Sequence, residues 1–111
     1  MQTLNEILHH IQDLQTRIEA ENNAAIQEHR RAAEYRARNE ASYAQSHART
    51  AMDHEQRALN MQNEITDLMQ AQEQLQAQLT ELDRKREAAL SNRDREVARI
   101  DAEIAKIRGG M

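Results

Sequence analysis

Large apolar residues recur at alternating steps of three and four residues toward both ends of the chain. This spacing places their side chains on one stripe of an α-helix, where a second helix can shield them from water. We predict that this stripe is an oligomer seam. Its members are Leu4, Ile7, Ile11, Leu14, Ile18, Ile65, Leu68, Leu75, Leu79, Leu82, Val97, Ile100, Ile104 and Ile107.

The middle of the chain keeps the spacing with smaller side chains. No Leu, Ile or Val lies between Gln27 and Ala58, and alanines occupy the stripe instead. Alanine lets two helices approach closely but buries little apolar area. This waist is either a narrow part of a coiled coil or a flexible segment that binds a partner. The predicted organisation is one coiled-coil element over 1–111, with N-terminal heptads at 4–18, an Ala/Arg-rich waist at 19–58, C-terminal heptads at 59–108 and a tail at 109–111.

Start and stop signals for a helix bracket nearly the whole chain. Thr3 and Glu6 have the spacing of a capping box, and Gly109 can adopt the left-handed conformation that ends a helix. These signals predict one long helix over 3–108. If the helix folds back, we expect the reversal at Thr50–Asp53, because this segment lies near the midpoint and contains capping residues.

Two irregularities mark the C-terminal stripe. Gln72 falls at a seam position, and the steps from Leu82 through Arg86 to Leu90 insert an extra four residues, which locally unwinds a supercoil. The last heptads place β-branched residues at both seam positions, which favours three or four helices, whereas the alternating Ile and Leu near the N-terminus favour two. The pattern therefore gives conflicting indications of strand number.

Three arrangements satisfy the stripe. A parallel dimer suits the segments 4–18 and 61–82, and an antiparallel dimer would lay 4–18 against 93–107. A helical hairpin folded near Thr50–Asp53 would make similar contacts within one chain. We favour an intermolecular dimer, because the chain has no proline and its only two glycines lie at the C-terminal end.

The composition supports an all-α fold. The chain has no Phe or Trp, two Tyr and 18 Ala, which is too little large apolar surface for an ordinary globular core. The net charge of −4 gives no overall attraction to polyanions. The chain lacks cysteine, a secretory signal and a long apolar run, so we expect a soluble cytoplasmic protein with no membrane partner.

The polar residues offer few candidates for chemistry. His9, His10 and Asp13 lie within about one turn, and His47 and His54 are one heptad apart, but no group supplies the three or four ligands that zinc requires. No nucleophile with its base and no phosphate-binding glycine loop is present. The sequence predicts no metal, no cofactor and no enzymatic activity.

The expected function is therefore that of a structural or adaptor protein that self-associates and docks another protein through helix–helix contacts. The alternative is a nucleic-acid-associated protein that uses an arginine-rich helical face, formed by Arg30, Arg31, Arg36 and Arg38. In its heptads and composition the chain resembles generic bacterial or phage coiled-coil adaptors, a resemblance that assigns no role to any residue.

Overall fold

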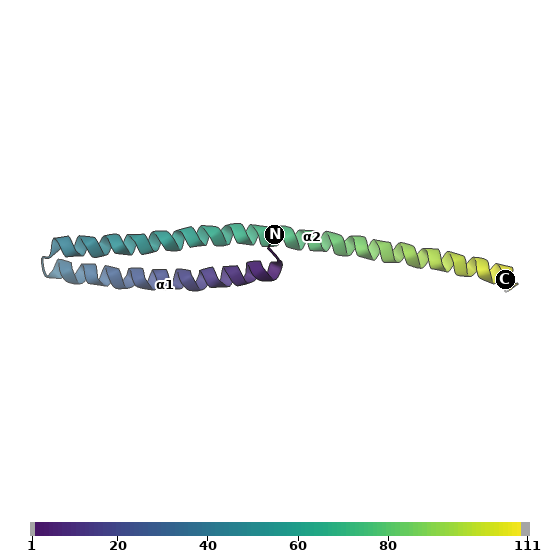
Figure 1. Ribbon diagram of the computed structural model, residues 1–111, viewed down its shortest axis with the longest axis horizontal. Coiled ribbons are helices and arrows are strands. Elements are labelled where there is room, and N and C mark those ends of the chain that lie inside the picture. Colours follow the sequence, from purple (N-terminus) through teal and green to yellow (C-terminus); the bar gives the residue numbers. More distant parts are fainter. Residues whose placement is uncertain (1, 110–111) are drawn as a thin grey trace. The chain divides into compact units, whose positions relative to one another are not determined.

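The computed structural model describes residues 2–109, which form two α-helices, as the all-α prediction requires. Helix α1 spans Leu4–Ala37 and helix α2 spans Ala41–Ile107 (Figure 1). The chain divides into two units, Met1–Glu73 and Gln74–Met111, which we call unit 1 and unit 2. Unit 1 contains α1 and the first half of α2, and unit 2 contains the rest of α2.

Both predicted helix ends are confirmed. The Thr3 hydroxyl accepts a hydrogen bond from the Glu6 amide at 3.2 Å, which satisfies one of the amides that the first turn leaves unpaired. At the other end, Gly109 has a φ of +77° and its amide donates to the Lys106 carbonyl at 3.1 Å. A left-handed glycine thus ends α2 as expected.

The predicted uninterrupted helix is wrong at one place, since the chain reverses at residues 38–40. The Glu40 amide donates to the Tyr35 carbonyl at 2.9 Å, and the Asn39 amide donates to the Arg36 carbonyl at 3.0 Å. These two bonds form a Schellman motif, whose left-handed residue is Asn39 with a φ of +60°. The chain therefore reverses without glycine or proline, because asparagine tolerates this conformation.

Unit 1 is consequently an antiparallel helical hairpin, in which α1 lies beside the first half of α2 (Figure 1). The fold-back predicted at Thr50–Asp53 is wrong, because these residues continue α2 as regular helix. The 4–18 stripe packs inside this hairpin at the level of Glu64, which His10 contacts at 3.3 Å.

The core of the hairpin changes along its length. Large residues fill it near the N-terminus, where Ile7 and Leu14 are each only 1% exposed. Small residues fill it toward the turn, so the predicted waist lies on both sides of the turn and packs on itself. The buried alanines are Ala25 and Ala32 of α1 and Ala44, Ala51 and Ala58 of α2.

Aromatic rings stack beside the turn. The Tyr35 ring lies 5.4 Å from the Tyr43 ring and 5.2 Å from the His47 ring, measured between centroids, and the Arg38 guanidinium lies 5.8 Å from the Tyr35 centroid. Such stacks add to the stability that area burial provides. The two tyrosines of the chain thus hold together the end of the hairpin where the alanine core buries least.

Unit 2 is a single stretch of α2 that runs to Ile107. Within residues 2–109, neither helix has a segment apolar and long enough to cross a membrane.

Candidate helix-docking surface

The most prominent surface feature of unit 2 is an apolar stripe with no partner helix. Every residue from 76 to 109 is exposed, whereas the same stripe of α2 is covered at intervals between Ala44 and Leu75. The exposed fractions of its large side chains are 49% for Leu79, 59% for Leu82, 48% for Leu90, 49% for Val97, 44% for Ile100, 41% for Ile104 and 86% for Ile107. We call this set the unit 2 stripe.

The stripe has the length of a coiled-coil interface. From Leu75 to Ile107 it extends over on the order of 50 Å of helix. A shallow depression that is open to solvent lies along its edge at Leu82, lined also by Ala77, Gln78, Glu81 and Lys85. Arg86 and Arg93 are the charged members of the same row of positions, and the others are apolar. A largely apolar stripe of this length is typical of helices that bind another helix.

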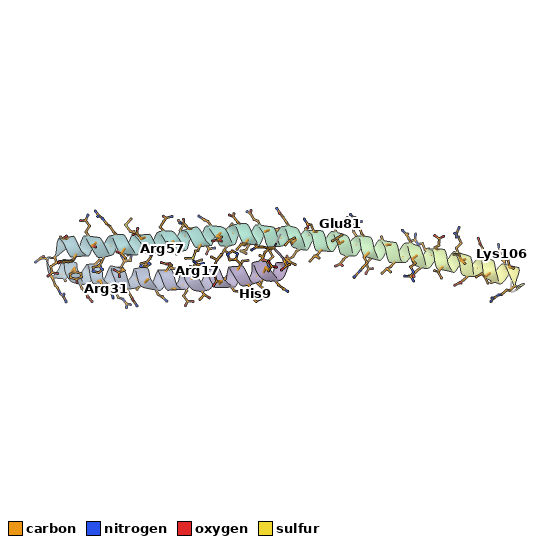
Figure 2. The ribbon with its side chains drawn as sticks, viewed as in Figure 1. His9, Arg17, Arg31, Arg57, Glu81 and Lys106 are labelled. Atoms are coloured by element: carbon orange, nitrogen blue, oxygen red, sulfur yellow. The ribbon has the colours of Figure 1, made fainter. Side chains whose placement is uncertain are left out.

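Charged residues beside the stripe form ion pairs along the same helix. Arg84 donates to Glu81, which Figure 2 labels, at 2.6 Å, and Arg99 donates to Glu96 at 2.8 Å, each over three residues. The hydrogen bond to Glu81 raises the pKa of the Arg84 guanidinium, which keeps its positive charge. Pairs of this kind support a helix that has polar flanks, and they leave the apolar stripe itself open.

The predicted seam residues therefore fall into two groups. Those of unit 1 lie in the hairpin core, where Ile7, Ile11, Leu14 and Ile65 are buried and Leu4, Ile18 and Leu68 are half-buried. Those of unit 2 lie on the surface, except for the half-buried Leu75. The structure thus assigns the first group to contacts within the chain and leaves the second group available to another helix.

A second cluster, which the sequence analysis missed, joins the two helices of unit 1. Glu28 pairs with His47 at 2.5 Å, and Glu21 pairs with His54 and also accepts from Arg57 Nε at 3.2 Å. The signal was present, since the glutamates continue the seam spacing of α1 and the histidines continue that of α2, each pair one heptad apart. The hairpin therefore places two glutamates of α1 against two histidines of α2.

These contacts shift the acidity of both carboxyl groups. The hydrogen bond with His54 holds the pKa of Glu21 below its ordinary value of 4.5, while partial desolvation opposes the shift and Arg57 reinforces it. The hydrogen bond with His47 likewise lowers the pKa of Glu28, against desolvation and with help from Arg31. Both glutamates are therefore held as carboxylates that link α1 to α2.

Two further histidines make similar contacts at the hairpin surface. His29 of α1 lies 2.5 Å from Glu55 of α2, and His10 of α1 lies 3.3 Å from Glu64 of α2. Among residues 2–109 no group of three or more His, Cys, Asp or Glu side chains could hold a metal ion. Each of the four histidines described here contacts one glutamate of the opposite helix.

The arginine face predicted for nucleic acid lies at the end of α1 nearest the turn. Arg30, Arg31, Arg36 and Arg38 are all exposed. Arg31 donates to Glu28 at 3.0 Å, and Arg38 lies over the Tyr35 ring, so these two side chains also serve contacts within the hairpin.

The site that unit 2 offers is a helix surface and not a cleft. Its members are apolar, regularly spaced and exposed, and they continue a stripe that another helix already covers in unit 1. Comparisons of this chain with protein-family models, with curated proteins and with solved structures found no match.

Proposed function

We propose that the protein is a non-enzymatic structural or adaptor protein that self-associates and docks a partner protein through helix–helix contacts made by the unit 2 stripe. The observation that carries the proposal is the exposure of that stripe from Leu79 to Ile107. Regularly spaced apolar side chains of this kind lose contact with water when a second helix packs against them.

The hairpin supports this proposal because its own seam is already filled. The buried side chains of α1 and those of α2 up to Ile65 are covered within unit 1, so a partner helix gains little by competing for them. The unit 2 stripe has no such cover. In this proposal unit 1 is a folded hairpin and unit 2 is the part that binds other helices. We also propose that the protein acts in the cytoplasm, with which the absence of cysteine agrees.

The proposal is tested by the mass of the full chain in solution. Light scattering over a range of concentrations should give a mass above the 12.9 kDa of one chain. Ile100→Asp places a charge in the stripe and should return the mass to that of one chain, because burying an unpaired carboxylate is costly. Arg95→Asp provides a matched control, since Arg95 lies off the stripe and its replacement should leave association intact.

Docking of a second protein is tested with the same variants. Crosslinking in the native lysate should join the wild-type chain and Arg95→Asp to the same partner, and Ile100→Asp to none. A wild-type chain that stays at 12.9 kDa at all concentrations would contradict self-association. Biological activity that survives in the monomeric Ile100→Asp variant would contradict the whole proposal.

A further inference from the structure

The seam positions of unit 2 are arranged symmetrically along the helix. From Leu75 to Ile104 its seam positions form two runs of five, with steps of 4-3-4-3 and 3-4-3-4, which meet at Ala89 and Leu90. The first run is Leu75, Leu79, Leu82, Arg86 and Ala89, and the second run is Leu90, Arg93, Val97, Ile100 and Ile104. Read backward, the second run has the same spacing as the first.

We infer that the unit 2 stripe binds the same stripe of a second copy, antiparallel, about a two-fold axis between Ala89 and Leu90. This inference rests on the proposed function and adds its partner and register. A two-fold interface uses one surface twice, so residue i of one chain faces residue j of the other and the reverse. The seam positions from Leu75 to Ile104 satisfy that condition, because each position of the first run faces one position of the second run.

The chemistry of the facing residues agrees with this register. In the outer layers Leu75 faces Ile104, Leu79 faces Ile100 and Leu82 faces Val97 of the second copy, so each of these pairs is apolar. In the central layers Leu90 faces Ala89, and Arg86 faces Arg93. Shifting one chain by a heptad would instead place Leu79 opposite Arg93, which would bury a cation against a leucine.

An Arg86–Arg93 pair lies on each side of the axis, and nearby acidic residues offset the repulsion between the two arginines. Asp83 and Asp94 lie beside each Arg86–Arg93 layer in this register, so two cations and two anions gather there. On the opposite edge Lys85 faces Glu96 of the second copy, which gives two complementary pairs per dimer. Long arginine side chains can keep their charged ends at the edge of the interface.

The side-chain shapes favour the antiparallel over the parallel arrangement. A parallel pair would stack Ile100 on Ile100 and Ile107 on Ile107, and β-branched residues at both seam positions shift parallel coils to three or four strands. In the antiparallel pair each apolar outer layer combines one leucine with one isoleucine or valine. The conflicting indications of strand number therefore resolve into a two-stranded interface.

Disulfide formation tests the orientation, because the chain has no native cysteine. Leu79→Cys and Ile100→Cys should link to each other when the two variants are mixed and oxidised, and neither should link to itself. Leu90→Cys, beside the axis, should link to itself and controls for reactivity. Efficient self-linking of Ile100→Cys would show a parallel pair and overturn the inference, as would a mass of three or four chains.

The outcomes separate the inference from the proposed function. A wild-type chain of single-chain mass contradicts self-association itself, and the inference falls with it. A wild-type dimer in which the mixture of Leu79→Cys and Ile100→Cys gives no link leaves the proposed function standing and overturns only the antiparallel register.

Charge reversal at the edge provides an independent test. Glu96→Lys should weaken the homodimer roughly three- to tenfold in Kd, because the introduced cation would then face Lys85 of the second copy. Mixing Glu96→Lys with Lys85→Glu should restore wild-type affinity, since both edge pairs are again complementary. In a parallel pair Glu96 would face Asp101, so Glu96→Lys would strengthen association there and contradict the antiparallel register.

Discussion

Units 1 and 2 share helix α2 and the same spacing of apolar residues, but the apolar stripe is buried in unit 1 and exposed in unit 2. In unit 1 the stripe of α2 is covered by α1, and Ile65 is only 3% exposed. In unit 2 the stripe is open, and Leu82 is 59% exposed. The same pattern of residues thus stabilises the fold in one place and offers a binding surface in the other.

The difference shows what heptad spacing can specify by itself. Spacing states that a helix needs a partner, but it does not state whether the partner lies in the same chain. In unit 1 the position of Asn39 decides the matter, because the turn brings α1 back along α2. Unit 2 contains no such turn between residues 74 and 107, so its stripe is left for another molecule.

The sharpest way to test this contrast is to truncate one leucine from each unit. Leu14→Ala should lower the free energy of unfolding of the hairpin by about 2–5 kcal/mol, since Leu14 is 1% exposed and its loss leaves a cavity. Leu82→Ala should change it by less than about 0.5 kcal/mol. Urea denaturation followed by circular dichroism measures both.

Both leucine variants are best made in the Ile100→Asp background, which removes the contribution of association. Equal effects of Leu14→Ala and Leu82→Ala in that background would mean that the two units do not differ in burial, and the comparison would fail.

A second test enlarges an alanine in each unit. Ala51 is fully buried in the hairpin, and Ala51→Leu should destabilise it by about 1–3 kcal/mol, because the two helices would have to move apart. Ala88 is exposed in unit 2, and Ala88→Leu is the matched control, which should leave the thermal midpoint nearly unchanged. A neutral Ala51→Leu would mean that the alanine core is loosely packed.

Much of this fold could be predicted from the sequence, and the exception has a physical cause. Helix propensity, the Thr3 cap and the 3-4 spacing predicted one helix over 3–108, which agrees with the start of α1 and the end of α2 but not with the interruption between them. A turn was not favoured because the chain has no proline and no internal glycine, and the alternative fold-back was placed at Thr50–Asp53 by its capping residues and midpoint position. In the structure Asn39 supplies the left-handed residue and backbone hydrogen bonds complete the motif.

The residues of the candidate site could also be predicted only in part. The spacing identified Leu79 and Ile100 as seam residues, but it could not separate them from Leu14 or Ile65, because all four occupy equivalent positions. The pairing of Glu21 and Glu28 with histidines depends on the position of the turn, which sets the residues that face each other. Spacing along each helix does not state where the chain reverses, so it could not supply these pairs.

A smaller effect is expected at the turn, where substitutions of Asn39 measure how much this residue contributes to the stability of the hairpin. Asn39→Gly should keep or slightly raise the stability of the hairpin, since glycine adopts a positive φ without strain. Asn39→Val should lower it by about 1–2 kcal/mol, because a β-branched residue is strained there. Thermal unfolding of the two variants measures the difference, and similar midpoints would mean that closure does not depend on this residue.

The smallest expected effect concerns pH and again separates the units. The pKa values of Glu21 and Glu28 are lower in the folded hairpin than in the unfolded chain, where the ordinary value is 4.5. Their contribution is therefore fully present above pH 4.5 and is lost as the pH falls through the folded-state pKa. His54 and Arg57 face Glu21, while His47 and Arg31 face Glu28, so protonation of either carboxyl removes contacts between or along the helices.

The thermal midpoint of the hairpin should accordingly decline as the pH falls from about 5 to about 3, and Glu28→Gln should flatten that decline. Glu81→Gln is the control, because Glu81 pairs with Arg84 of the same helix in unit 2 and links nothing to α1. An unchanged profile in Glu28→Gln would show that the Glu28–His47 contact contributes nothing to closure. A steeper decline in Glu81→Gln would show instead that the two units do not respond to pH independently.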